Sequence, residues 1–262
     1  MLLTIVPPPP ANLSNLATVV PMSKCVVILQ SNYIPWKGYF DLVNAADEFW
    51  IFDDVQFTRR DWRNRNKIIV NGQPTWLTIP VMSKGQFLSR ILDMEVADPD
   101  WAAKHWRSIR HAYAKAPYLA DYESTLVGLY ESASRLTRLT EINELFLTRI
   151  AALLGIEARF RRAETIAREA DTPTGRLVEI CKASGADMYV SGPAAKSSIH
   201  PRQFEDAGIA LRYCDYSGYP TYDQGTETFE HGVSIVDMLL RIGPQTVTHL
   251  KSRPDRERFL EP

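Results

Sequence analysis

Short apolar runs alternate along the chain with stretches of helical periodicity, and this alternation predicts strands and helices in turn. Cys25–Leu29 is an apolar run typical of a strand buried on both faces, and Lys37–Ala46 places apolar residues at helical spacing. Glu48–Phe52 has the pattern of a second buried strand. A strand, a helix and a strand form a βαβ unit, so we expect the two strands to pair in parallel with a right-handed crossover.

The rest of the chain continues this pattern around one tight hairpin. Lys67–Val70 and Thr75–Ile79 flank Asn71-Gly72, a dipeptide that accepts the positive φ angles of a type I′ turn. Further helices are expected over residues 99–116, 126–154 in two pieces, 176–184, 193–207 and 232–242, with strands over 187–190 and 209–213. The sequence therefore predicts an α/β fold with a Rossmann-like, mostly parallel sheet, helices on both faces and a helical insertion at about 98–155. A HUP-like sheet is a narrower alternative within this class.

One α/β domain is expected over residues 22–251, because no repeat or low-complexity tract interrupts this part of the chain. Residues 1–21 have the character of a disordered leader. No basic segment precedes their apolar stretch and Pro7–Pro10 interrupt it, so a signal peptide is not expected. Met22 is an alternative first residue to Met1. Residues 252–262 are rich in charge and are expected to form a flexible tail.

Composition and motifs narrow the function classes. The chain of 262 residues is 45% apolar and 23% charged with a net charge of −1, so no overall field favours nucleic acid or an acidic membrane. No run approaches the ~20 apolar residues of a membrane span, and three scattered cysteines are typical of reduced thiols in a cytoplasmic protein. The motifs GxGxxG, GxxxxGK[ST], GxSxG and HExxH are absent, as is a His/Cys cluster at metal spacing. We therefore expect no metal and no tightly bound cofactor.

The loop after the first strand is the first candidate for ligand binding. It leaves the carboxyl end of that strand, and this edge is where ligands bind in open α/β sheets. Gln30 and Asn32 supply amide donors and acceptors, whereas Tyr33 and Trp36 are aromatic with polar tips. This mixture suits sugars or nucleobases, so we predict that all four residues bind substrate.

Acidic residues at the end of the second strand are candidate catalytic bases. If Asp53 and Asp54 are both extended, their side chains point to opposite faces, so only one enters the cleft comfortably. Such a carboxylate can act as a general base or hold a substrate amine. His105 is a further candidate acid–base residue, although nothing in the spacing distinguishes it from His111 on the same predicted helix.

Basic residues in two later segments are candidates for binding an anion. The run Arg59–Lys67 contains arginines that bind phosphate or carboxylate through paired N–H groups, together with a tryptophan that can stack on a ring. The run Ser191–Lys196 joins a strand to a predicted helix, whose N-terminus would favour a phosphate. The predicted substrate-binding residues in these segments are Arg60, Trp62, Arg65, Asn66, Ser191 and Lys196.

Taken together, these segments resemble the WbqC-like family of bacterial proteins. The family pattern is found in Gln30-Ser-Asn-Tyr-Ile-Pro-Trp-Lys-Gly-Tyr-Phe-Asp41, Asp53-Asp-Val-Gln-Phe57, Arg59-Arg-Asp-Trp-Arg-Asn-Arg-Asn66, Lys115-Ala-Pro-Tyr118, Gly185-Ala-Asp-Met-Tyr-Val-Ser-Gly-Pro-Ala-Ala-Lys196 and Val233-Ser-Ile-Val-Asp237. The similarity extends from Met22 to about Gly243. Ser31 stands where the family usually has proline, and Ser197–His200 departs from the pattern. Gln56, in the second motif, is a further predicted substrate-binding residue.

The resemblance implies an enzyme of polysaccharide or natural-product biosynthesis that attaches an acyl or aminoacyl group to an amine. It implies no catalytic role for any one residue. Our leading hypothesis is a transferase whose donor is CoA or the phosphopantetheine thioester of an acyl or peptidyl carrier protein. The acceptor would be the amine of an amino sugar or a similar small molecule. A thioester is already activated, so such an enzyme needs no ATP-binding loop.

Two alternatives belong to other classes. A nucleotidyltransferase-like enzyme on a HUP-type fold would use the segment Trp36–Tyr39, where such enzymes keep an HxGH signature, but both histidines are absent here. A non-catalytic binding or scaffold protein of a biosynthetic complex would hold a partner protein and would need no catalytic base.

Overall fold

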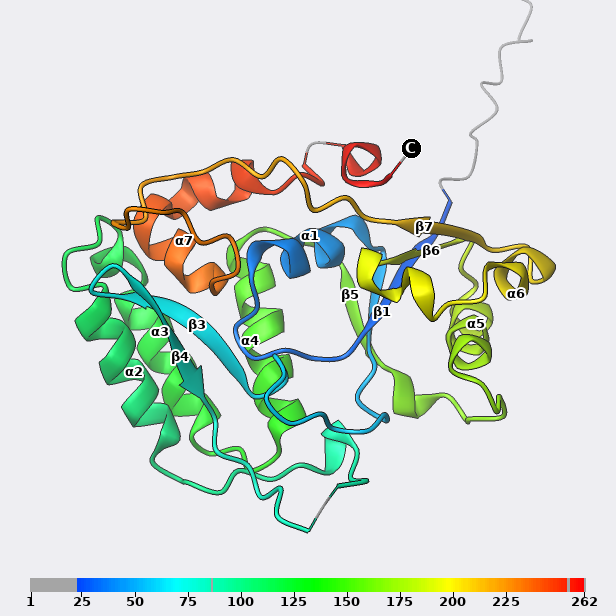
Figure 1. Ribbon diagram of the computed structural model, residues 1–262, viewed down its shortest axis with the longest axis horizontal. Helices are drawn as coiled ribbons and strands as arrows, with labels where there is room; N and C mark the ends of the chain where they lie inside the picture. The colour runs from blue at the N-terminus through cyan, green and yellow to red at the C-terminus, as the bar shows by residue number, and fades with distance from the viewer. Residues whose placement is uncertain (1–22, 86, 254, 262) are drawn as a thin grey trace, which may run out of the picture.

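A parallel sheet of five strands organises the molecule, in the order β5-β2-β1-β6-β7. The computed structural model describes residues 23–85, 87–253 and 255–261, so the predicted leader and the choice between Met1 and Met22 lie outside the described residues (Figure 1). The strands are β1 (Cys25–Leu29), β2 (Glu48–Ile51), β5 (Arg159–Arg162), β6 (Met188–Ser191) and β7 (Ala210–Tyr213). The chain moves outward from β1 to β2 and β5, then returns to β6 and moves outward to β7. The predicted α/β, Rossmann-like class is confirmed, and the topological switch point lies between β1 and β6.

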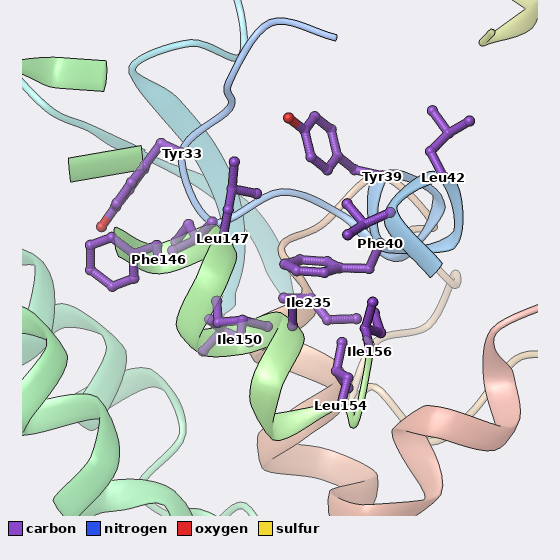
Figure 2. Packing of buried hydrophobic residues seen from close by; sticks show 14 of the residues in the cluster. Tyr33, Tyr39, Phe40, Leu42, Phe146, Leu147, Ile150, Leu154, Ile156 and Ile235 are labelled. Carbon is purple, nitrogen blue, oxygen red and sulfur yellow. The ribbon is translucent and has the colours of Figure 1, made fainter. Parts of the chain in front are cut away.

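Helices cover both faces of this sheet. Successive side chains of β1 point to opposite faces, so Cys25 and Val27 belong to one apolar cluster and Val26 and Ile28 to the other. The larger cluster is covered by α1 (Lys37–Ala45) and α4 (Leu139–Leu153), and the smaller by α5 (Pro173–Ser184) and α6 (Pro201–Asp206). Figure 2 shows the larger cluster, where Phe40 of α1 lies among aliphatic side chains from α4 and from Ile235.

The segment between β2 and β5 contains a hairpin as well as the expected helices. Strands β3 (Arg65–Val70) and β4 (Gln73–Thr78) are antiparallel, and the turn residues Asn71 and Gly72 have φ angles of 49° and 75°, as predicted for a type I′ turn. Helices α2 (Trp101–Ala112) and α3 (Leu119–Ala133) pack beside this hairpin, on the side of the molecule away from α5 and α6 (Figure 1). Their buried side chains belong to the same cluster that covers β1, so the insertion shares the main core.

Short 3₁₀ helices and one last α-helix complete the chain. Helix α7 (Ile235–Ile242) packs against α3 and β3. The 3₁₀ helices are η1 (Ile91–Asp93), η2 (Ala163–Thr165), η3 (Pro193–Ser197), η4 (Gly243–His249) and η5 (Arg256–Phe259).

The structure differs from the predicted elements in two places. The expected helix over 193–207 is divided into η3 and α6, because His200 is extended before Pro201, as the residue before a proline prefers. Strand β5 was not predicted, since its Arg-rich sequence lies on an edge with little apolar pattern. Part of the predicted flexible tail, residues 252–262, packs against the domain, since Phe259 is fully buried and Leu260 pairs with Cys214.

Candidate functional site

The loop after β1 is anchored by a buried carboxylate at the end of β2. Asp53 accepts hydrogen bonds from the backbone N–H of Ser31 (2.8 Å), the Ser31 hydroxyl (2.7 Å) and the Thr140 hydroxyl (2.5 Å). Burial raises the pKa of Asp53, while these hydrogen bonds and the charge of Arg63 oppose the shift. The side chain is 1% exposed and its oxygens already have donors, so we assign Asp53 the role of holding the loop rather than that of a base.

Backbone strain marks the same loop. Ile34 has a φ of 35° although it is β-branched and precedes Pro35. The buried Asn66 side chain donates from Nδ2 to the carbonyls of Tyr33 (3.0 Å) and Ile34 (2.9 Å), which holds the strained turn. Strain of this kind persists only where the surroundings enforce it, and it is concentrated at functional sites.

An arginine fixes the two amide side chains of the loop. Arg63 donates from Nη2 to Oε1 of Gln30 (3.2 Å) and from Nη1 to Oδ1 of Asn32, and its own carbonyl accepts a hydrogen bond from Asn143 (2.8 Å). Arginine can only donate, so both amide oxygens must face it. The NH₂ groups of Gln30 and Asn32 are thereby left as donors for another molecule. Arg63 was not predicted as a site residue, because nothing in the sequence of Arg59–Lys67 distinguishes it from the other basic residues of that run.

A cavity of about 300 Å³ opens beside the Asn32 amide. Its lining residues are Asn32, Pro35, Trp36, Trp62, Asn66 and Gly232. The Trp36 ring lies edge-on to Tyr216 with ring centroids 4.9 Å apart, and a Cβ at Gly38 would come within 2.3 Å of that ring. Trp62 is 37% exposed, so part of its ring is free to contact a ligand. We call this cavity the tryptophan pocket; its size and mixture of aromatic and amide groups suit a small polar ring.

A second cavity of about 260 Å³ is lined by three arginines, Arg59, Arg60 and Arg65, together with uncharged residues. In the part of the chain that the structure describes, none of the three forms an ion pair. The Arg65 guanidinium stacks over Trp76 at 4.1 Å, and the rings of Trp76 and Trp62 are 5.1 Å apart. This arginine pocket is therefore linked to the tryptophan pocket through a stack of side chains, and its unpaired cations suit an anion.

The other predicted site residues lie elsewhere. Asp54 pairs with Arg176 of α5 (3.1 Å), and Gln56 donates to the carbonyl of Phe87 (2.8 Å). Ser191 is buried, and its hydroxyl accepts a long hydrogen bond from Tyr189 (3.5 Å). Lys196 pairs with Glu261 (2.5 Å) and lies over the Tyr213 ring.

The structure thus brings some of the predicted residues together and separates others. The tryptophan pocket gathers Asn32, Trp36, Trp62 and Asn66, with Gln30 attached through Arg63, and the arginine pocket holds Arg60 and Arg65. Lys196 lines neither pocket and belongs to a five-residue 3₁₀ helix instead of the first turn of an α-helix. Ser191–Lys196 therefore does not form the predicted phosphate site at the N-terminus of an α-helix.

Tyr33 and His105 belong to a buried network. Tyr33 is fully buried, and its ring lies against Phe146 (Figure 2). His105 Nε2 donates to the carbonyl of Thr78 (3.1 Å), so Nδ1 accepts from the Tyr33 hydroxyl (2.9 Å), which is also bonded to Tyr130 (2.7 Å). Both residues face the core, which gives them a structural role in place of ligand contact.

This burial leads to a testable pH dependence. Desolvation lowers the pKa of His105 from 6.5 to about 4, so the unfolded chain binds a proton at a higher pH than the folded chain. Stability should therefore fall as the pH drops from 6.5 to 4, by up to about 3 kcal/mol from this residue. Urea unfolding at several pH values should show a smaller fall in a His105→Gln variant. The exposed His111→Gln is the control, and equal pH dependence in wild type and His105→Gln would contradict this interpretation.

Metal-ligand clusters and membrane-spanning helices are both absent within residues 23–85, 87–253 and 255–261. No group of three or more His, Cys, Asp or Glu side chains is arranged to hold a metal ion there. No helix in these ranges has the length and apolar character needed to span a bilayer.

Comparison with known proteins gives two matches. A model of the WbqC-like protein family matches residues 30–249. The chain is also similar to an uncharacterized protein of Mycobacterium tuberculosis (strain ATCC 25618 / H37Rv), Rv1507c. The two are 40% identical over 228 residues, which are 87% of this chain and 98% of the relative. No solved structure matches.

Proposed function

The chain belongs to the WbqC-like protein family, and on that premise we propose that it transfers an acyl or aminoacyl group from a thioester to the amine of a small acceptor. The observation that carries the proposal is the pair of hydrogen bonds from the Arg63 guanidinium to the side-chain oxygens of Gln30 and Asn32. Asn32 lines a pocket with aromatic walls. The acceptor class is an amino sugar or a similar polar ring. The reaction belongs to polysaccharide or natural-product biosynthesis in the cytoplasm.

Acyl transfer requires hydrogen-bond donors that are in place before the reaction. When an amine attacks a thioester carbonyl, negative charge develops on the carbonyl oxygen. The Asn32 amide supplies N–H groups whose direction is fixed by Arg63, so little reorganisation is needed when that charge appears. Trp36 and Trp62 provide apolar walls against which the ring of an amino sugar can lie.

The arginine pocket fits the other substrate. CoA and the phosphopantetheine arm of a carrier protein both carry phosphate next to the thioester-bearing chain. Arg60 and Arg65 offer paired N–H groups for such a phosphate, with no described carboxylate competing for them. The Trp62–Trp76–Arg65 stack places the arginine pocket beside the tryptophan pocket, so donor and acceptor can bind at the same time.

An assay of thiol release tests the proposal. The purified protein is incubated with CoA thioesters or acyl-loaded carrier proteins and with free or nucleotide-linked amino sugars. We expect release of free thiol that depends on both substrates, whereas absence of amine-dependent release with every pair would contradict transferase activity. Stable capture of the carrier protein without turnover would instead favour the non-catalytic binding protein.

Substitution of Arg65 should separate donor binding from chemistry. Arg65→Met keeps an apolar side chain against Trp76 but removes a charged donor, so we expect the KM for the thioester to rise about 10- to 100-fold while kcat changes less. The control is Arg107→Met, at an exposed position of α2. An unchanged KM for every thioester would exclude Arg65 from donor binding.

A further inference from the structure

A lysine next to the tryptophan pocket is buried. Lys37 begins α1 immediately after Trp36, and it is 2% exposed. Its Nζ lies 3.0 Å from Nδ1 of His231, which immediately precedes Gly232 in the wall of the tryptophan pocket. The two residues thus come from two segments that border the same cavity.

Aromatic rings surround the Lys37 ammonium. Its Nζ lies 5.1 Å from the centroid of Tyr219, 6.0 Å from that of Tyr222 and 4.9 Å from that of Phe229. Among the described residues no carboxylate lies within ion-pair distance of this nitrogen, so His231 is its one hydrogen-bond acceptor there. Lysines that are buried without a counter-ion are uncommon and are concentrated at functional sites.

Two carboxylates from the sequence motifs hold rings of this aromatic cage, which consists of Tyr219, Tyr222 and Phe229, without forming an ion pair with the lysine. Asp41 accepts a hydrogen bond from the Tyr219 hydroxyl, and Asp237 accepts one from the Tyr222 hydroxyl (2.6 Å). Both carboxylates are fully buried. They fix the two rings around Lys37, which gives a physical reason for the presence of these acids in the sequence motifs.

We propose that His231 and Lys37 form the acid–base pair of the tryptophan pocket. This inference rests on the proposed acyl transfer. His231 is the catalytic residue, because it is exposed and directly precedes Gly232 of the pocket wall, and Lys37 acts through it as a positioning residue that takes up the proton. An acceptor amine is an ammonium ion near neutral pH and must lose a proton before it can attack.

Every proton in this step has a donor and an acceptor. The acceptor ammonium gives a proton to Nε2 of His231, and the imidazole passes its Nδ1 proton to the neutral Lys37 amine. The acceptor nitrogen then bonds to the thioester carbon, the C–S bond breaks, and the thiolate takes the second proton of that nitrogen. Lys37 returns the first proton to solvent through His231. The products are an amide, a free thiol and one released proton.

The protonation equilibria of the pair agree with this role. Burial lowers the pKa of Lys37 to about 8, and the charges of Asp237 and Asp41 oppose this shift. Burial and the neighbouring Lys37 both lower the pKa of His231, while Glu230 opposes the shift. Titratable and charged groups from four parts of the chain face the pair. They are Asp41 of α1, Asp237 of α7, Lys67 of β3, and Tyr219, Tyr222 and Glu230 of the segment before α7. Lys67 forms an ion pair with Glu230.

Nitrogen NMR of ¹⁵N-histidine-labelled protein tests the pair without any substrate. When Lys37 is charged, Nδ1 of His231 accepts its proton and Nε2 carries the hydrogen; when Lys37 is neutral, the tautomer reverses. We expect the two ring nitrogens of His231 to exchange chemical shifts around pH 8 in wild type but not in Lys37→Arg, which keeps a cation in the cage. His231→Gln identifies the signals. A wild-type spectrum without this exchange between pH 6.5 and 9.5, or the same exchange in Lys37→Arg, would overturn the proposal.

Kinetics then test whether the pair serves the reaction. We expect wild-type kcat to fall about tenfold from pH 9 to pH 7, and His231→Gln to lower kcat about 100-fold with little change in the KM for the amine. Lys37→Arg should remove the pH dependence, and His111→Gln should match wild type. If His231→Gln keeps wild-type kcat, the acid–base role is wrong although acyl transfer stands. If no transferase activity exists, the NMR result still decides whether the pair is coupled.

Discussion

Replacement of Arg176 by methionine is expected to destabilise the protein by about 3–5 kcal/mol. Arg176 is 1% exposed, and its guanidinium donates to Asp54 (3.1 Å), to Glu179 (2.6 Å) and to three backbone carbonyls. Methionine has a similar volume but no donors, so it would leave the Asp54 carboxylate and the carbonyls without partners in a buried place. Urea unfolding followed by circular dichroism gives the free energy of unfolding that checks this value.

A matched control and a double variant make the Arg176 experiment specific. Arg107→Met makes the same chemical change at an exposed helical position and should shift stability by less than about 0.5 kcal/mol. Asp54→Asn in addition to Arg176→Met removes the orphaned charge, so the double variant should be more stable than Arg176→Met alone. A loss below about 1 kcal/mol in Arg176→Met would mean that water replaces the missing donors and that the ion pair is not buried in solution.

The positions of Asp53 and Asp54 show that sequence patterns predict the direction of a side chain better than its partner. Extended residues alternate between faces, so Asp53 and Asp54 were expected to point in opposite directions. In the structure Asp53 bonds to Thr140 of α4 on one face, and Asp54 pairs with Arg176 of α5 on the other. The alternation could be predicted, but the partners could not, because they are 87 and 122 residues away along the chain.

The candidate site could be predicted only in part, because the loop conformation and the distant segments that complete the site leave no pattern in the sequence. The loop after β1 was placed at the carboxyl edge of the sheet because parallel strands end at a shared edge, and Asn32 and Trp36 do line a pocket there. Tyr33, however, is buried in the core next to the strained Ile34, and no periodicity in an irregular loop could predict that turn. Lys37 was missed because its position in a regular helix gave no sign that the cage around it comes from the segment before α7.

The largest effect on activity is expected at Arg63 and Asn32. Removal of one oxyanion donor by Asn32→Ala should lower kcat about 100- to 1,000-fold, and Arg63→Met should have a similar effect because Arg63 fixes the direction of that donor. If Arg63 acts through Asn32, the double variant should be little slower than either single variant, since the two changes remove the same interaction. Steady-state kinetics of thiol release with wild type, both single variants and the double variant measure this coupling, and Arg107→Met is the control. Fully multiplicative losses would show that Arg63 and Asn32 contribute independently, in which case the fixed amide is not the group that stabilises the transition state.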